Sequence, residues 1–265
     1  MKAVFTDLDG TLLNSTYSYS KSLDALRLLQ AKKIPIIFCS AKTRAEQEVY
    51  REELDITDPF VVENGGAVFI PENYFSFPID YHKVVPGYSV IELGTPYERL
   101  RVVLKEVERR TGMTIKGFGD MSVEEVARDS GLSLEFARLA KQREYSETLK
   151  LEADRARQDL VLRKIKEAGL DCTHGGRYYE VMKGNDKGKA TYILTRLLRQ
   201  KFDKVETVGI GDSQNDLPML GAVDIPMLVQ KLDTSWEKTN LDNLRRVEGV
   251  ASVGWSKAIK EIFGG

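Results

Sequence analysis

The sequence predicts an α/β fold, a doubly wound and mostly parallel sheet that is interrupted by an inserted α/β unit. Three observations support this prediction. Short runs such as residues 34–39 are apolar at every position, which is typical of strands covered on both faces. These runs alternate with helical patterns, as they do in doubly wound sheets. The alternation stops near residue 83 and resumes near residue 184, so we expect an insertion between these points.

The first part of the chain contains the first strands of the sheet. Buried strands are expected at residues 3–6, 34–39 and 60–62. Between them, Leu23, Leu26 and Leu29 share one side of a helix, and a second helix is expected over residues 46–54. Residues 67–77 are expected to form a hairpin.

The middle of the chain has a different pattern, with a half-exposed strand at residues 88–93 and a helix that starts at Tyr97. Further strands are expected near residues 113–116, 147–152 and 177–182, and further helices at 123–129, 134–141 and 155–168. We expect an open antiparallel sheet with helices on one face. The predicted domains are therefore a core of residues 1–82 and 184–265 and an inserted domain of residues 83–183.

After the insertion the first pattern returns. Residues 187–200 place Ala190, Leu194 and Leu198 on one helical face, and residues 205–210 form another buried strand. The strand runs directly into a polar segment that begins at Gly211.

Composition excludes several classes of protein. The 265 residues are 42% hydrophobic and 30% charged with a net charge of −1, so the chain can bury a core and has no basic field for nucleic acid. The longest apolar run, residues 34–39, is too short to span a membrane. Cys39 and Cys172 lie far apart, as expected for reduced thiols. We expect a soluble, cytoplasmic protein without a nucleic-acid or membrane partner, and the sequence leaves its oligomeric state open.

Polar residues stand where the predicted strands end. In open α/β sheets the binding crevice lies beyond the carboxyl ends of the strands, so these residues should converge. Lys187, at the start of a helix that returns to the sheet, can join them. The residues at the strand ends are Asp7, Asp9, Ser40, Glu63, Asn64, Asp212, Asn215 and Asp216.

The types of these residues indicate phosphate chemistry. Carboxylate oxygens without histidine or cysteine suit Mg²⁺, and a lysine, a serine hydroxyl and backbone N–H groups suit a phosphoryl group. An aspartate can act as a covalent nucleophile. A second carboxylate two residues further on can transfer the proton.

The order of these motifs resembles the haloacid-dehalogenase-like phosphatases. The resemblance covers the whole chain and rests on Asp7-Leu8-Asp9-Gly10-Thr11, Ser40, Lys187 and Gly211-Asp212-Ser213-Gln214-Asn215-Asp216. It implies a Rossmann-like core with a substrate-specificity cap, in which Asp7 is the nucleophile and Asp9 the general acid/base.

The same resemblance assigns the remaining residues of the site. Ser40 and Lys187 would contact the phosphoryl group. Mg²⁺ would be bound by Asp7, the Asp9 backbone carbonyl and Asp212, with support from Asp216 or Asn215. Whether Asp216 binds the metal directly or orients its ligands stays open at this point.

A closer resemblance within that family is to the mannosyl-3-phosphoglycerate phosphatases. It rests on Ser40-Ala41-Lys42-Thr43-Arg44 in place of the more common Thr-Gly-Arg, together with residues 63–66, 142–147, 175–178 and 184–189. It implies hydrolysis of mannosyl-3-phosphoglycerate to mannosylglycerate, a compatible solute, and phosphate. The residues expected to bind substrate are Ser40, Lys42, Thr43, Arg44, Asn64, Arg143, Gly175, Gly176, Arg177, Lys187 and Asn215.

Alternatives remain for both the function and the residues. The enzyme could act on glucosyl-3-phosphoglycerate or another sugar phosphate, it could be a phosphomutase, or the scaffold could be a non-catalytic sensor of phosphorylated ligands. Ser40 could simply cap a helix, Gly175-Gly176 could be a tight hairpin connection, and Arg143 could be a solvated residue of the cap.

Overall fold

The computed structural model describes residues 1–151, 154–175 and 177–264. Its core is a sheet in the order β12-β11-β10-β1-β2, in which neighbouring strands are parallel. The strands are β1 (Lys2–Thr6), β2 (Ile36–Phe38), β10 (Glu206–Gly211), β11 (Ile225–Gln230) and β12 (Arg245–Val250). The predicted α/β fold with a parallel sheet is confirmed.

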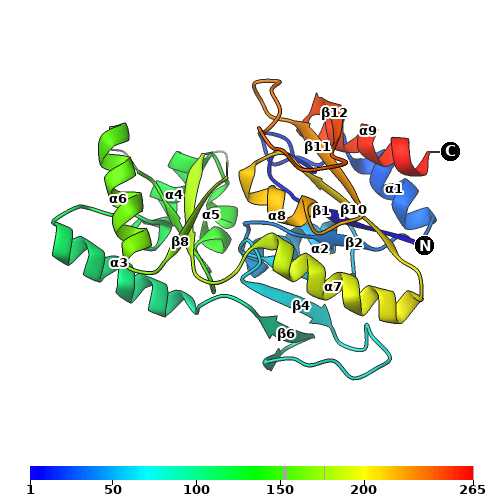
Figure 1. The fold of residues 1–265 in the computed structure, drawn as a ribbon, viewed down its shortest axis with the longest axis horizontal. Coiled ribbons are helices and arrows are strands. Elements are labelled where there is room, and N and C mark those ends of the chain that lie inside the picture. Colours follow the sequence, from blue (N-terminus) through cyan, green and yellow to red (C-terminus); the bar gives the residue numbers. More distant parts are fainter. Residues whose placement is uncertain (152–153, 176, 265) are drawn as a thin grey trace.

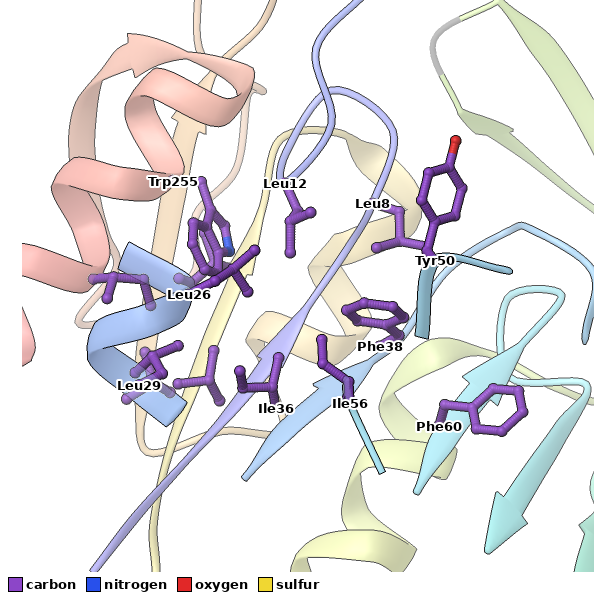
Figure 2. Close-up of a cluster of buried hydrophobic side chains, with 14 of the residues drawn as sticks. Leu8, Leu12, Leu26, Leu29, Ile36, Phe38, Tyr50, Ile56, Phe60 and Trp255 are labelled. Atoms are coloured by element: carbon purple, nitrogen blue, oxygen red, sulfur yellow. The ribbon is translucent and has the colours of Figure 1, made fainter. Parts of the chain in front are cut away.

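Helices cover both faces of this sheet (Figure 1). Successive strand residues point to opposite faces, so Val4 and Phe5 of β1 belong to different apolar clusters. Val4 belongs to the cluster that contains Trp255 and Leu26. Figure 2 shows Trp255 and Leu26 within this cluster. Phe5 packs with the side that holds Leu194. The helices are α1 (Leu23–Ala31), α2 (Arg44–Glu53), α7 (Lys187–Phe202), α8 (Leu217–Leu220) and α9 (Ala251–Phe263).

A second, antiparallel sheet extends the core in the order β3-β4-β6-β5. Its strands are β3 (Phe60–Val62), β4 (Ala67–Pro71), β5 (Lys83–Val85) and β6 (Tyr88–Glu92). Val61 of β3 also forms a parallel bridge with Cys39, which links the two sheets. The expected hairpin within residues 67–77 is wrong, because β4 pairs with β3 and β6. Phe75, beyond β4, packs into the apolar cluster on the α7 side.

The inserted part contains an antiparallel sheet in the order β7-β9-β8. Its strands are β7 (Glu147–Leu149), β8 (Asp171–Gly175) and β9 (Tyr178–Met182), and its helices are α3 (Tyr97–Thr111), α4 (Val123–Ser130), α5 (Leu134–Ala140) and α6 (Arg155–Glu167). A short 3-10 helix spans Phe118–Asp120. Leu104 of α3 and Ile165 of α6 pack with Val181 of β9.

Two predicted strands of this part differ from the structure. The expected strand at 113–116 is wrong: Ile115 is buried in the helix–sheet cluster, and its N–H donates to the Glu108 carboxylate at 2.7 Å. Strand β7 ends at Leu149, short of the expected residue 152, which lies outside the described residues.

The division into a core of residues 1–82 and 184–265 and an inserted domain of 83–183 stays a prediction. Strand β6 is hydrogen-bonded to β4 of the core and β5 to β6, and neither pairs with β7, β8 or β9. We therefore propose that the inserted domain begins after Glu92. Among the described residues, no helix combines the length and the apolar character that crossing a membrane requires.

Candidate active site

A buried lysine joins two aspartates at the carboxyl end of the parallel sheet. Asp7 follows β1 directly, and its N–H donates to the carbonyl oxygen of Ile210 in β10 at 3.0 Å. Lys187, the fully buried first residue of α7, donates from Nζ to Asp7 Oδ1 at 2.7 Å and to Asp216 Oδ1 at 2.6 Å. Burial alone would lower the pKa of Lys187, but Asp216 and Asp7 outweigh it and raise that pKa. The ammonium therefore stays charged.

The segment after β10 brings a third carboxylate to the site. Asp212 Oδ1 accepts a hydrogen bond from the Thr11 hydroxyl at 3.1 Å. The N–H groups of Asp212 and Ser213 both donate to Asp216 Oδ2 at 3.0 Å. Gly211 is needed here, because a Cβ atom at this position would lie 2.5 Å from Cβ of Asp216. This tight turn holds Asp212 and Asp216 against the end of β1.

The carboxylates of Asp7, Asp212 and Asp216 fit a divalent cation. Each offers one oxygen, and these oxygens lie within 4.8 Å of one another. Burial raises the pKa of Asp7 to about 7 and that of Asp212 well above its ordinary value, and the neighbouring carboxylates add to both rises. Hard oxygen donors of this kind suit Mg²⁺. Because both oxygens of Asp216 already accept hydrogen bonds, the geometry favours Asp216 as a residue that orients the ligands.

Asp9 lies at the open side of the site with a lysine as its partner. Its side chain is 46% exposed, and its Oδ2 lies 3.0 Å from Nζ of Lys42. Lys42 is buried and also donates to Glu46 Oε1 at 3.2 Å. Partial burial raises the pKa of Asp9, and Lys42 opposes that rise. A carboxyl group with a raised pKa holds its proton more readily than an ordinary aspartate and so suits general acid catalysis.

The segment from Ser40 to Arg44 forms a loop and the start of α2. The Ser40 hydroxyl accepts the N–H of Lys42 at 3.3 Å. The helix cap is Thr43, which exchanges hydrogen bonds with Glu46 in a capping box, so the alternative reading of Ser40 as the cap is wrong. The Arg44 guanidinium donates to Glu144 of the inserted part at 3.1 Å and to Glu48 at 3.3 Å.

Two asparagines connect the end of β3 with the segment after β10. Asn215 Nδ2 donates to Asn64 Oδ1 at 3.0 Å, and Asn64 N donates to the carbonyl oxygen of Ser40 at 3.0 Å. Gly175, at the end of β8, lies close by, because a Cβ atom there would be 3.4 Å from Asn215 Nδ2. The inserted part thus approaches the core at Asn215. Gly176 lies outside the described residues.

The two arginines of the inserted part that are expected to bind substrate also have partners within the protein. Arg143 is buried and donates to Glu180 Oε2 at 2.9 Å and to the carbonyl oxygen of Ala41 at 2.9 Å. The alternative that Arg143 is a solvated residue of the cap is therefore wrong. Arg177 donates to the carbonyl oxygen of Asp129 at 2.6 Å. It lines a cavity of about 270 Å³ in the inserted part. Its other lining residues are Asp129, Lys150, Leu151, Gln158, His174, Tyr178 and Tyr179.

Sequence reasoning gave no role to three buried glutamates near the site. Glu46 positions Lys42, and the Thr43–Glu46 capping-box spacing was a local signal that could have identified it. Glu63 was placed at a strand end without a function, yet its carboxylate accepts N–H groups from the inserted part. Glu180 forms an ion pair with Arg143 within the inserted part, and no local sequence pattern predicts this pair.

Comparisons with known proteins agree with this geometry. The family model described as haloacid dehalogenase-like hydrolase matches residues 4–233. A protein of Methanococcoides burtonii named glucosyl-3-phosphoglycerate/mannosyl-3-phosphoglycerate phosphatase is 50% identical, and the match covers 98% of this chain and 97% of that protein. A mannosyl-3-phosphoglycerate phosphatase of Pyrococcus furiosus is 38% identical, with 94% of this chain and 98% of that protein covered.

Solved structures share the fold. A haloacid dehalogenase-like hydrolase from Bacteroides thetaiotaomicron superposes with a TM-score of 0.68 at 17% identity, and the match covers 99% of both chains. One from B. subtilis gives a TM-score of 0.68 at 19% identity, with 99% of this chain and 100% of that chain covered. The chain belongs to the haloacid dehalogenase-like hydrolase family.

Proposed function

We propose that this chain is a Mg²⁺-dependent phosphatase that converts mannosyl-3-phosphoglycerate to mannosylglycerate and phosphate. The observation that carries the proposal is the ion pair of Lys187 with Asp7 and Asp216 beside Asp212, which assembles a phosphoryl-transfer site. The names of the Methanococcoides and Pyrococcus relatives support the substrate. The product is a compatible solute, and we place the reaction in the cytoplasm.

In the proposed reaction, one carboxylate oxygen of Asp7 attacks phosphorus. A bond forms between that oxygen and phosphorus, while the bond between phosphorus and the glycerate oxygen breaks. Lys187 already holds Oδ1, so attack through Oδ2 leaves the ion pair intact. Asp9 gives its proton to the departing glycerate oxygen.

The second half of the reaction regenerates the enzyme. Asp9, now a carboxylate, takes a proton from a water molecule, and the resulting hydroxide attacks phosphorus of the aspartyl phosphate. The bond between phosphorus and the Asp7 oxygen breaks, phosphate leaves, and Asp7 returns as a carboxylate. Lys42 beside Asp9 stabilises the charged form between the two steps.

Bound Mg²⁺ would neutralise the repulsion between the phosphate and the carboxylate of Asp7. The residues that would hold it are Asp7, Asp212 and the backbone carbonyl of Asp9, and Asp216 would orient them. Lys187 would neutralise the remaining negative charge of the carboxylate cluster.

We propose that residues from both parts of the chain bind the substrate. Ser40, Asn64 and Asn215 are linked by hydrogen bonds at the carboxyl end of the strands and would donate to phosphoryl oxygens. The segment Lys42, Thr43 and Arg44 lies at the start of α2. The inserted domain would act as a specificity cap, and it contains Arg143, Gly175, Gly176 and Arg177. Positive side chains there suit a substrate that carries both a carboxylate and a phosphate.

One experiment tests the substrate. Phosphate release is measured with mannosyl-3-phosphoglycerate, glucosyl-3-phosphoglycerate, 3-phosphoglycerate and hexose 6-phosphates, each with millimolar Mg²⁺. We expect kcat/KM for the glycosyl-3-phosphoglycerates to exceed the others by roughly a hundredfold. Equal values across the panel would contradict the substrate. Stoichiometric release of phosphate would exclude a phosphomutase, and no release from any ester would favour a sensor.

A second candidate substrate is glucosyl-3-phosphoglycerate. The specific observation is the double name of the relative at 50% identity, which covers both glycosyl groups. The ratio of kcat/KM for the two glycosyl substrates decides between a single and a dual specificity.

A further inference from the structure

The loop of Glu63, Asn64, Gly65 and Gly66, here called the 63–66 loop, has an unusual backbone. Glu63 has φ = 49° and Asn64 has φ = 54°, so two neighbouring residues with side chains lie in the left-handed region. This region is sparsely populated by residues other than glycine, and occupying it costs free energy. Surrounding contacts must therefore hold the loop in this form.

The two connections between core and inserted part both bind this loop. In the first connection, the N–H groups of Leu93 and Gly94 donate to the carbonyl oxygen of Gly66 at 2.9 and 2.8 Å. In the second, Asn185 Nδ2 donates to the carbonyl oxygens of Glu63 and Asn64 at 3.3 and 3.2 Å.

A third attachment uses the side chain of Glu63. This fully buried carboxylate accepts the N–H of Glu144 at 2.7 Å on Oε1, and the N–H groups of Tyr145 and Ser146 at 3.0 and 2.7 Å on Oε2. The Ser146 hydroxyl adds a hydrogen bond to Oε2 at 2.9 Å. Arg143 Nε lies 3.6 Å from the same oxygen and offsets part of the cost of burying this charge.

The backbone around Glu63 also contacts the catalytic loops. Its own N–H donates to the carbonyl oxygen of Lys42 at 3.1 Å. The next residue, Asn64, donates from its N–H to Ser40 and accepts from Asn215. A shift of the Glu144–Ser146 segment would therefore be transmitted through two residues to Ser40 and Asn215.

We propose that Glu63 is a positioning residue that locks the inserted domain onto the core, and that Arg143 serves this lock. The inference rests on the proposed function, because the lock would hold Arg177 and Gly175 over the substrate. A carboxylate that accepts three consecutive N–H groups is a charge-assisted anchor. Removing its charge leaves those donors without a full partner, which loosens the segment.

The test compares two variants of buried glutamates that face the same arginine. Glu63→Gln removes the charge at the contact between core and inserted domain, and Glu180→Gln removes a charge within the inserted domain. Hydrogen exchange at the amides of 144–146 is measured, together with KM and kcat for mannosyl-3-phosphoglycerate and for p-nitrophenyl phosphate. The second ester carries no glycosyl-glycerate for the inserted domain to hold.

For Glu63→Gln we expect exchange at 144–146 to be faster by roughly tenfold or more. KM for the glycosyl substrate should rise by a larger factor than KM for p-nitrophenyl phosphate, because only the glycosyl substrate is held by the inserted domain. Glu180→Gln should keep the protection of 144–146. Ser146→Ala removes one hydrogen bond to Glu63 and those that Arg143 donates to the same hydroxyl. It should shift exchange in the same direction by less, and it serves if Glu63→Gln does not fold.

Unchanged exchange at 144–146 in Glu63→Gln, or equal loosening in Glu180→Gln, would overturn the lock. If Glu63→Gln does not fold, unchanged exchange in Ser146→Ala overturns it instead. Exchange is read without substrate, so it decides the lock even if the wild-type enzyme hydrolyses no glycosyl-3-phosphoglycerate. That second result would contradict the proposed function alone.

Discussion

Nζ of Lys187 lies 2.7 Å from Oδ1 of Asp7, across a separation of 180 residues and with both side chains buried. The contact joins the end of β1 to the start of α7 and closes the carboxylate cluster. It neutralises part of a charge that would otherwise destabilise the core.

Replacing Lys187 by methionine should destabilise the metal-free protein by about 3–5 kcal/mol, because Asp7 and Asp216 lose their buried cation. Urea unfolding measures the change. Added Mg²⁺ should restore part of the loss by supplying positive charge. Lys189→Met is the matched control: this lysine is 59% exposed, and its removal should change stability by about 0.5 kcal/mol or less. Equal losses in the two variants would contradict the role of Lys187.

Asp7→Asn should lower phosphate release by roughly a thousandfold or more, because an amide cannot serve as the nucleophile. Asp9→Asn should cost roughly a hundredfold to ten-thousandfold, the range of general acid–base catalysis. Mass spectrometry of acid-quenched enzyme should detect phosphate bound to the wild-type protein but not to Asp7→Asn. Wild-type turnover in Asp7→Asn would refute the mechanism.

Stabilisation by Mg²⁺ should grow with pH. In the folded protein the pKa of Asp7 is about 7, above its ordinary value of 3.8. Between these two pH values the unfolded chain releases this proton more readily, so the metal-free fold loses stability as the pH rises. Asp212 acts in the same direction. The rise in Tm on adding Mg²⁺ should therefore be larger at about pH 8 than at about pH 5, where protons compete for the ligands. Asp212→Asn should weaken this dependence, and an equal rise at both pH values would count against a metal at these carboxylates.

Both cysteines should be inert in the native protein. Burial raises the pKa of the Cys39 thiol and of the Cys172 thiol to about 12, so almost no thiolate exists at neutral pH. A colorimetric thiol reagent should find no fast-reacting thiol in native protein and two after denaturation. Rapid modification of Cys39 without unfolding would show that the α7 side of the sheet opens.

Much of the fold could be predicted because strands and helices leave local patterns. The apolar runs at 3–6 and 60–62 and the helical spacing of Ala190, Leu194 and Leu198 all correspond to observed elements. Pairing was harder, because β4 has partners on both sides that no local pattern indicates. The strand expected at 113–116 was wrong for a similar reason, since Ile115 is apolar because it packs between the helices and the sheet of the inserted part.

By itself, the sequence determined the types and the order of the residues in the site. Asp7, Ser40, Lys187 and Asp212 each stand where an apolar run ends or a helix begins, and such positions can be recognised from a few neighbouring residues. Their convergence follows from the rule that parallel strands end at one edge of a sheet.

Only the tertiary structure decided how the inserted domain attaches to that edge. Glu63 and its partners at 144–146 are 81–83 residues apart, and Arg143 lies 37 residues from Glu180 and 102 from Ala41 in the chain. Such contacts depend on the relative placement of separately folded segments. The stability of each of these contacts depends on burial and on the pairing of opposite charges, and neither can be predicted from a short stretch of sequence.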